Sequence, residues 1–312
     1  MRLLLYLLIL ISPLLVSGQD FDFFLPASQQ VIFGTYDADA QAFIDAVGTL
    51  TESQEIAVDN LVKGLKANGL WSKLDVVYPI IGGTAAAHKW NLKDPRDSDD
   101  AFRLVFSSSG SGSWIHDANG MENVSTATTD AAIAVTYYHL SDLGAETSDF
   151  NCSISFYQNK DYSLMSRPRA IVAMTGYNGG DNFHFGVRNT GTMNFYLGQN
   201  SGSTSYSGDG RQFSTMATQS DGNVSMYKNG VIVGTVTTPA RNLNFLNDRP
   251  LAFGSLMNGS APYDISDCLS SYHSSARYAF VSVGKEDLTA TEAANLNNVV
   301  EVYQDALGRG VN

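Results

Sequence analysis

The residues best suited to contact a ligand are aromatic and polar side chains in turn-rich sequence. Aromatic rings stack on sugar faces, and amide or carboxylate groups hydrogen-bond sugar hydroxyls. The candidates lie in the stretches 175–182 and 203–211 and at one tryptophan: Tyr177, Asn178, Asp181, Tyr206, Arg211 and Trp114. They predict a glycan-binding site, although tyrosine is also common in strands and a structural role stays open.

Paired carboxylates, which glycoside hydrolysis needs, are missing from the middle of the chain. Glycosidases place two acids close together across the scissile bond. Between residues 89 and 283 the only glutamates are Glu122 and Glu146, which lie far apart in loop-like sequence. We therefore predict that the chain is not an enzyme, and a glycoside hydrolase remains an unlikely alternative.

A polysaccharide lyase is a second catalytic alternative. Such an enzyme would use histidine and tyrosine for proton transfer and arginine to neutralise a sugar acid. His184, Arg188 and Tyr196 supply these residue types on alternating, strand-like sequence. A histidine beside an arginine is more often part of a solvated sheet face, which makes the lyase the weaker hypothesis.

Metal and cysteine chemistry is sparse. The five histidines show no spacing typical of a zinc site, and no cofactor is predicted. Loop acids leave a Ca²⁺ site open as an alternative; they are Asp161, Asp181, Asp209, Asp264 and Asp267. Cys152 and Cys268 are disulfide candidates in an oxidising compartment, and two separately buried thiols are the alternative.

Residues 1–18 are typical of a secretory signal peptide. Arg2 supplies the positive charge, residues 3–15 are apolar, and residues 16–18 are small enough for cleavage. The apolar run is shorter than the roughly 20 residues of a membrane span and contains Pro13. We predict a secreted or virion-surface protein that is not an integral membrane protein; an uncleaved anchor is the alternative.

Four Asn-x-Ser sequons also occur, at Asn123, Asn151, Asn223 and Asn258.

The formal net charge of −12 indicates which partners are suitable. Excess acid repels phosphate backbones, so nucleic acid is an unsuitable partner and a glycan or protein surface is favoured. The sequence leaves the oligomeric state open.

Helical periodicity occurs at both ends of the chain. A short helix is expected over 37–47, and a second begins at the capping box Thr51-x-x-Gln54 and ends near Asn68. A third begins at the capping box Thr289-x-x-Glu292 and ends at Gly308. Each has one apolar stripe and needs a surface to bury it, through mutual packing or packing on one side of a sheet.

The region between these helices has the period of two that is typical of strands. Apolar residues alternate with polar ones around positions 102–106, 183–187, 193–197 and 278–283, and turn residues separate the runs. The clearest signal is the stretch 221–236, where two such runs meet at Asn229-Gly230, because Asn-Gly favours a type I′ hairpin turn. Many short antiparallel strands predict a mainly β sandwich.

Several stretches resemble a known group of proteins. They are residues 69–74 (GLWSKL), 78–83 (YPIIGG) and 88–97 (HKWNLKDPRD), the hairpin, and residues 288–309. The chain resembles concanavalin A-like proteins of the laminin G-like type, found among phage virion and tail components and bacterial surface proteins. The resemblance covers about residues 40–310 and implies a jelly-roll sandwich with amphipathic helices before and after it, without transferring any catalytic residue.

The expected domains are therefore a signal peptide (1–18), an N-terminal helical segment (19–88), a laminin G-like sandwich (89–285) and a C-terminal helix packed back on it (286–312). The expected function is a non-catalytic secreted or particle-surface module for adhesion, display or glycan binding. A structural virion, tail or surface-layer protein is the alternative.

Overall fold

The structure is a computed structural model of the chain. It describes residues 35–124, 131–139, 141–143, 151–164, 169–173, 182–188, 191–198, 200–208, 210–219, 222–237, 250–254 and 275–311. Residues 36–312 belong to one compact unit. Within the described ranges, none of the helices has the length and apolar character that crossing a membrane requires.

The structure describes four helices: α1 (Ala38–Val47), α2 (Glu52–Ala67), the single-turn α3 (Ala85–His88) and α4 (Ala290–Ala306). Of these, α1, α2 and α4 form where the capping and periodicity signals predict them, and α3 was not predicted. Both predicted capping boxes are present, since the Thr51 and Thr289 side chains each accept from the N3 backbone and the N3 side chain reciprocates. The predicted helix boundaries are thereby confirmed to within two residues.

Fifteen strands are described, all paired antiparallel. Their bounds are β1 Val76–Tyr78, β2 Val105–Ser109, β3 Ser113–Asp117, β4 Gly120–Val124, β5 Ala131–His139, β6 Ser153–Gln158, β7 Arg169–Ala173, β8 Asn182–Arg188, β9 Thr192–Gly198, β10 Asn200–Ser205, β11 Gln212–Thr218, β12 Asn223–Lys228, β13 Val231–Thr237, β14 Pro250–Phe253 and β15 Arg277–Gly284.

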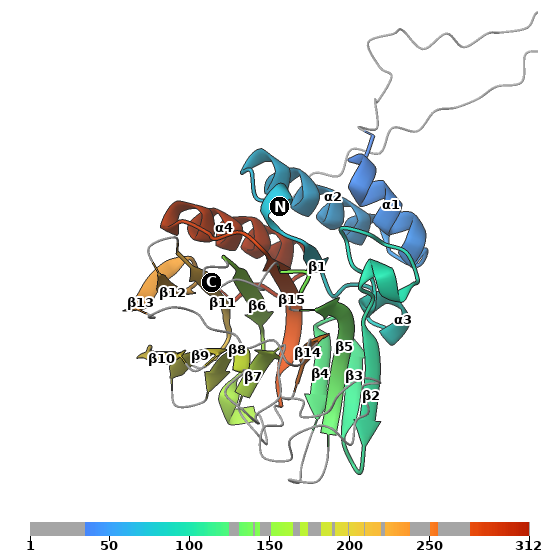
Figure 1. The fold of residues 1–312 in the computed structure, drawn as a ribbon. Coiled ribbons are helices and arrows are strands. Elements are labelled where there is room, and N and C mark those ends of the chain that lie inside the picture. The colour runs from blue at the N-terminus through green and yellow to red at the C-terminus, as the bar shows by residue number, and fades with distance from the viewer. Residues whose placement is uncertain are drawn as a thin grey trace, which may run out of the picture. The chain divides into compact units, whose positions relative to one another are not determined.

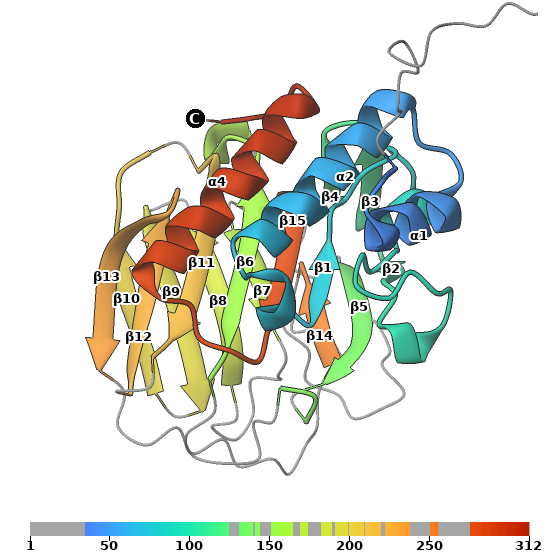
Figure 2. The same cartoon turned by 90° about the horizontal axis from the view of Figure 1, so that it is seen from above.

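The described strands form two stacked sheets. Sheet A has the order β13-β12-β11-β6-β15-β4-β3, with β1 paired to β15, and sheet B has the order β10-β9-β8-β7-β14-β5-β2. Contacts between β10 and β13 and between β2 and β3 show that the strand orders of the two sheets run in the same direction. The mainly β sandwich predicted from the sequence is confirmed (Figures 1 and 2).

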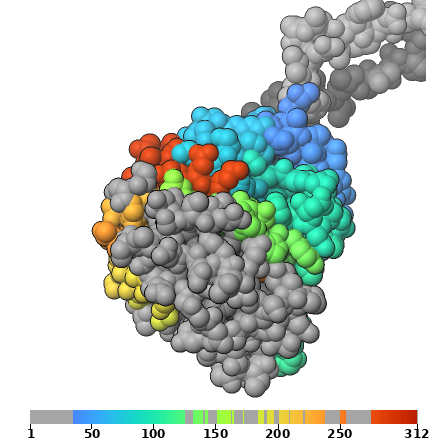
Figure 3. Space-filling view, viewed as in Figure 1, coloured from blue at the N-terminus to red at the C-terminus, as the bar shows by residue number. Residues whose placement is uncertain are grey.

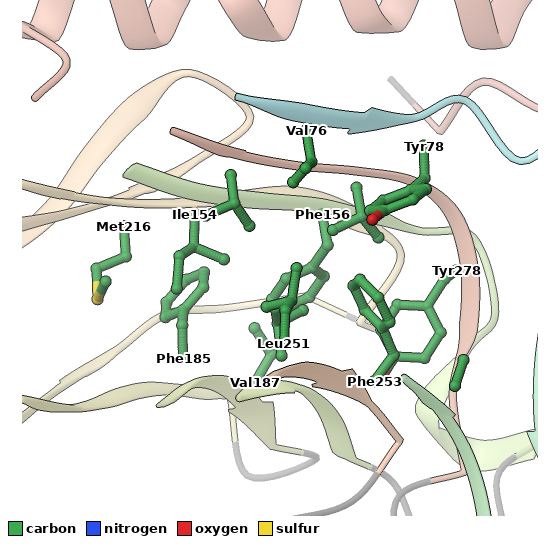
Figure 4. Close-up of a cluster of buried hydrophobic side chains, with 14 of the residues drawn as sticks. Val76, Tyr78, Ile154, Phe156, Phe185, Val187, Met216, Leu251, Phe253 and Tyr278 are labelled. Atoms are coloured by element: carbon green, nitrogen blue, oxygen red, sulfur yellow. The ribbon is translucent and has the colours of Figure 1, made fainter. Parts of the chain in front are cut away.

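Two apolar cores hold three layers together. The first lies between the sheets, where Phe156 and Tyr278 of sheet A meet Phe185, Leu251 and Phe253 of sheet B (Figure 4). All five side chains are fully buried. Because burying a large apolar side chain stabilises by about 1.5–3 kcal/mol, this aromatic layer is a major contribution to the stability of the sandwich.

The second core lies between sheet A and the helices. The predicted stripe of α2, which is Val58, Leu61, Val62 and Leu65, is buried there together with Val300 of α4. Helices α2 and α4 pack against each other and cover sheet A (Figures 1 and 2), and α1 packs on α2. In the space-filling view the red surface of α4 adjoins the blue surface of α2 (Figure 3). The apolar stripes of the helices are therefore buried both by packing of the helices against each other and by packing on one side of a sheet, as predicted.

The hairpin expected at Asn229-Gly230 is present between β12 and β13. Both turn residues have positive φ, 49° at Asn229 and 73° at Gly230, as a type I′ turn requires. The Asn229 side chain also accepts a hydrogen bond from the Phe213 amide at 2.9 Å. The turn is thus fixed to sheet A as well as to its own hairpin.

Three local differences from the sequence expectation are visible. The N-terminal segment is not entirely helical, because β1 adds a strand to β15. Phe102 lies in a left-handed turn conformation and not in a strand, since β2 begins at Val105. Glu122 lies in strand β4 and not in a loop.

Candidate functional site

The candidate site lies on the outer face of sheet B, the face that points away from sheet A and the helices (Figure 1). Phe185 and Val187 of β8 point into the core between the sheets. Since side chains alternate across a strand, His184, Gly186 and Arg188 lie on the outer face. By the same rule, the strand register places two β9 residues beside them on that face: Asn194 opposite Gly186, and Tyr196 opposite His184.

His184 and Asn194 form a hydrogen-bonded pair at this site. Asn194 Nδ2 lies 3.3 Å from His184 Nε2. Gly186 opposite Asn194 has no side chain, so the asparagine amide has room to reach the diagonal histidine. Both residues are buried, with 7% of His184 and 8% of Asn194 exposed.

Among the described residues, the remaining polar atoms of the pair, His184 Nδ1 and Asn194 Oδ1, have no hydrogen-bond partner. With Asn194 donating to Nε2, the neutral imidazole carries its proton on Nδ1, which is then a donor, while Asn194 Oδ1 is an acceptor. Turning the amide over exchanges these roles. Either way the pair offers one unused donor and one unused acceptor.

Burial keeps His184 uncharged. Desolvation, with a smaller contribution from the Arg188 charge, lowers the pKa of His184 to about 3. The pair is therefore neutral at physiological pH. Leaving such buried polar atoms unsatisfied costs about 1–3 kcal/mol each, so each atom gains by pairing with a water, an ion or a ligand.

The surroundings of the pair are aromatic and hydroxyl-rich. The Tyr196 ring lies beside the His184 ring, with centroids 4.4 Å apart and an angle of 32° between the planes. Tyr196 is half-exposed, and the next strand, β10, presents three exposed hydroxyls on the same face: Ser201, Ser203 and Ser205. A partly exposed ring flanked by hydroxyl groups suits contact with a sugar.

Sheet B also differs from the rest of the chain in charge. The chain has 31 aspartate and glutamate residues, yet none lies in the seven strands of sheet B. Arg169 and Arg188, opposite each other in the β7–β8 register, are the only Asp, Glu, Lys or Arg residues in those strands. This distribution provides no strand carboxylate for glycosidase chemistry on this face.

Among the residues that the structure describes, the predicted ligand contacts are not brought together. Trp114 lies on β3 at one lateral edge, where its indole donates to the Ile133 carbonyl at 3.1 Å and its ring packs on Phe106 and His116. Tyr206 follows β10 at the opposite edge, packed against the core beneath the Lys228 ammonium group. Arg211 is exposed just before β11.

The other predicted contacts, Tyr177, Asn178 and Asp181, lie outside the described residues. So does Cys268, while Cys152 is fully buried and its amide donates to Thr218 Oγ1 at 2.7 Å. No disulfide occurs among the described residues. The Cys152–Cys268 bond remains a prediction.

Glu122, one of the two glutamates of the sandwich region, is engaged in ion pairs. It is 4% exposed and bonded to Lys160 and to Arg277, whose Nη2 lies 2.6 Å from Glu122 Oε2. A carboxylate held by two cations on sheet A is a structural group. Glu146 lies outside the described residues.

The described loop acid from the predicted Ca²⁺ set, Asp161, accepts a hydrogen bond from the Ser163 amide at 2.7 Å, as turn residues do. The other four acids of that set lie outside the described ranges. Within those ranges, no group of three or more His, Cys, Asp or Glu side chains could hold a metal ion.

One sequon is ruled out as a glycosylation site. Asn123 is fully buried, and its amide donates to the Gly254 carbonyl at 3.4 Å and accepts from the Ala276 amide at 2.9 Å. An attached glycan has no room at such a position.

Sequence reasoning found His184, Arg188 and Tyr196, but as a weak catalytic set, and missed Asn194. The signal for Asn194 was the polar position between Met193 and Phe195. That pattern places Asn194 on the outer face, but only the strand register brings it to His184.

No protein-family model matches the chain, and a comparison with curated protein sequences gives no match. Among solved structures, the chain is similar to botulinum neurotoxin type C, in a structure described as showing that cell entry depends on interaction with two ganglioside molecules. The identity is 13% and the TM-score 0.49, over 75% of this chain and 53% of that chain. It is also similar to the CBM40 module of a Ruminococcus gnavus IT-sialidase bound to α2,6-sialyllactose, with 12% identity and a TM-score of 0.37 over 51% of this chain and 91% of that module.

The chain thus spans about half the length of the neurotoxin structure it matches. The architecture itself defines the class: a two-sheet β-sandwich domain with a helical layer on sheet A.

Proposed function

We propose that the chain is a non-catalytic glycan-binding module whose binding surface is the outer face of sheet B. The observation that carries the proposal is the unused donor and acceptor of the His184–Asn194 pair. A hydroxyl group accepts one hydrogen bond and donates another, so sugar hydroxyls match both atoms. The half-exposed Tyr196 ring beside the pair supplies the apolar surface that a pyranose face needs.

The charge distribution favours an acidic glycan. Arg188 is half-exposed on the same face, and no described carboxylate forms an ion pair with it. Guanidinium groups bind carboxylates and sulfates through paired hydrogen bonds. We therefore expect Arg188 to contact the anionic group of the saccharide, and the His184–Asn194 pair to contact its hydroxyls.

Two features argue against catalysis on this face. A general acid or base works best with a pKa near the working pH, whereas that of His184 is about 3. The strands of sheet B supply no acid to pair with it. A lyase built on His184, Arg188 and Tyr196 is therefore not favoured.

The proposed context is extracellular. The signal-like residues 1–18 support secretion or display on a particle surface, where a glycan-binding sandwich of the laminin G-like type would act in adhesion. The test is to fractionate a culture into cells and medium and to determine the N-terminal sequence of the protein. We expect a chain in the medium that has lost residues 1–18, and a chain that begins at Met1 and stays with the cells would contradict the proposal.

The central experiment removes the polar pair. The double variant His184→Phe/Asn194→Leu replaces both partners by apolar groups of similar size, which is nearly neutral or stabilising when no ligand is bound. We expect its free energy of unfolding to be unchanged or raised by up to about 2 kcal/mol, and its glycan binding to be lost. A glycan array with neutral, carboxylated and sulfated saccharides, followed by calorimetry, provides the binding readout.

Asn297→Leu is the matched control. Asn297 on α4 also has a buried Oδ1 without a partner, but it lies in the helical layer on the other side of sheet A. Its replacement should leave glycan binding intact. If the double variant loses several kcal/mol in its free energy of unfolding, the pair is structural. Unchanged glycan binding in the double variant would refute the proposed site, and so would a wild-type protein that binds no saccharide on the array.

A further inference from the structure

One lateral edge of the sandwich is unusually free of charge. Sheet A ends there in β13 and sheet B ends in β10. Their sequences, VIVGTVT and NSGSTS, contain no Asp, Glu, Lys or Arg. Edge strands of stable monomers usually carry charges or proline, because their free backbone groups otherwise pair with another chain.

Most of the β13 strand is exposed. Four of its seven residues are exposed, and the other three are half-buried, with Val233 and Val236 packed against the core between the sheets. Val231 is 67% exposed and Ile232 is 49% exposed, so two of the large apolar side chains on the described surface are consecutive in this edge strand. In the described part of the chain β13 pairs with β12 alone, and its other edge is unpaired.

The two edge strands lie close together and are tied to each other. Thr204 Oγ1 of β10 donates to the Val233 carbonyl of β13 at 2.7 Å. Glycines allow this approach: a Cβ at Gly234 would lie 2.6 Å from Thr204 Oγ1, and one at Gly202 would lie 2.8 Å from Val236 Cγ2. Both sheets therefore end together, and the edge is a single two-strand surface.

We propose that this edge is a self-association surface, on which a second copy of the chain pairs β13 with β13 and β10 with β10. A two-fold axis perpendicular to the sheets makes any edge strand antiparallel to its own copy. Because the sheets are stacked, the same axis passes through both and pairs both edges at once. The result is two continuous sheets shared by two copies.

The distribution of charge favours a second copy of the chain as the partner that binds this edge. The chain carries a net charge of −12, so two copies repel each other over most of their surfaces. The edge offers no charge to attract a charged partner segment, and its Val231 and Ile232 side chains gain most by contacting an equally apolar surface. The uncharged edge of a second copy meets both conditions.

The test is the oligomeric state of the full chain by sedimentation equilibrium. We expect a dimer whose dissociation constant rises at least about tenfold in the Ile232→Lys variant, because a buried lysine at the edge has no partner. Ile56→Lys is the matched control, since Ile56 is 45% exposed on α2, and it should leave the dimer unchanged.

Complementary variants distinguish self-pairing from other contacts. Thr235 is exposed on β13. Thr235→Lys and Thr235→Glu chains should each be weaker dimers, and their mixture should recover association, because the two-fold axis brings each position near its own copy. A monomer at all concentrations, a dimer unaffected by Ile232→Lys, or a mixture that recovers nothing would overturn the proposal. The varied residues lie on β13 of sheet A and the His184–Asn194 pair lies on sheet B, so a failure of dimerisation and a failure of glycan binding are measured separately.

Discussion

The Nδ1 atoms of His88 and His116 lie 3.0 Å apart, and the two imidazoles share one hydrogen bond. Such a bond needs one protonated and one bare nitrogen, so two fully protonated rings are incompatible with this contact. His88 is buried and its Nε2 has no partner, while the Phe106 and Trp114 rings flank His116. The pair joins α3 to β3, and its hydrogen bond is lost once both rings are protonated.

The first prediction concerns stability in acid. Burial, then the His116 and Arg309 charges, lowers the pKa of His88 to about 3, and burial also lowers the pKa of His116. Unfolded histidine titrates near 6.5, so below that pH the unfolded chain binds more protons than the folded chain. The stabilisation is complete above about pH 6.5 and is lost progressively as the pH falls toward 3.

Chemical denaturation between pH 7 and pH 4 measures this loss. Each histidine with a lowered pKa contributes up to about 1.4 kcal/mol per pH unit. The double variant His88→Gln/His116→Gln should therefore show a flatter decline than the wild type. Equal slopes for the two proteins would contradict the assignment.

The second prediction is that glycan affinity does not depend on pH between 5 and 8. His184 stays neutral over this range because burial, aided by the Arg188 charge, holds its pKa at about 3. Its donor pattern is then constant, and the anionic group of a uronic or sulfated sugar remains ionised. Calorimetry at pH 5, 6.5 and 8 checks this. A bell-shaped dependence would instead indicate a proton-transferring site.

The sequence predicted the helices and the hairpin well because their signals are local. The capping boxes at Thr51 and Thr289 and the turn at Asn229-Gly230 depend on contacts within a few residues. Strand β1 was missed because three apolar residues carry no periodicity, and only pairing with β15, about 200 residues later, defines them as a strand.

The candidate site was harder to predict because it depends on strand register. His184 and Asn194 lie ten residues apart in sequence, and only the β8–β9 pairing brings them into contact. Trp114 and Tyr206 had suitable chemistry, but the order of strands places them at opposite edges. Local sequence carries no information about which strands become neighbours.

The third prediction concerns Arg309, which joins the C-terminus to the sandwich. Its buried guanidinium donates to Gln304 Oε1 at 2.6 Å and to four backbone carbonyls, those of Pro79, Ile80, Ala118 and Ala279, at 3.0–3.3 Å. Arg309→Met would leave several of these buried acceptors unsatisfied, which we expect to cost about 3 kcal/mol in the free energy of unfolding.

Arg96→Met is the control for that measurement. The Arg96 side chain is 58% exposed and pairs with Asp94 and Asp100 on the surface, so its loss should change stability by less than about 1 kcal/mol. If guanidinium-chloride unfolding gives similar losses for both variants, the Arg309 network is not the structural link that its hydrogen bonds indicate.

The fourth prediction separates backbone strain from packing at the hairpin turn. Gly230 has φ +73°, and a Cβ there would lie 3.0 Å from Ala294 Cα and 3.0 Å from Asn297 Cβ of α4. Gly308 has nearly the same backbone, with φ +70°, but nothing lies within 4 Å of its Cβ position. Gly308→Ala should therefore cost only the left-handed strain of about 1 kcal/mol, whereas Gly230→Ala should cost about 2–3 kcal/mol because it also displaces α4. Urea unfolding of the two variants gives the difference, and equal losses would mean that the turn and α4 are not in close contact.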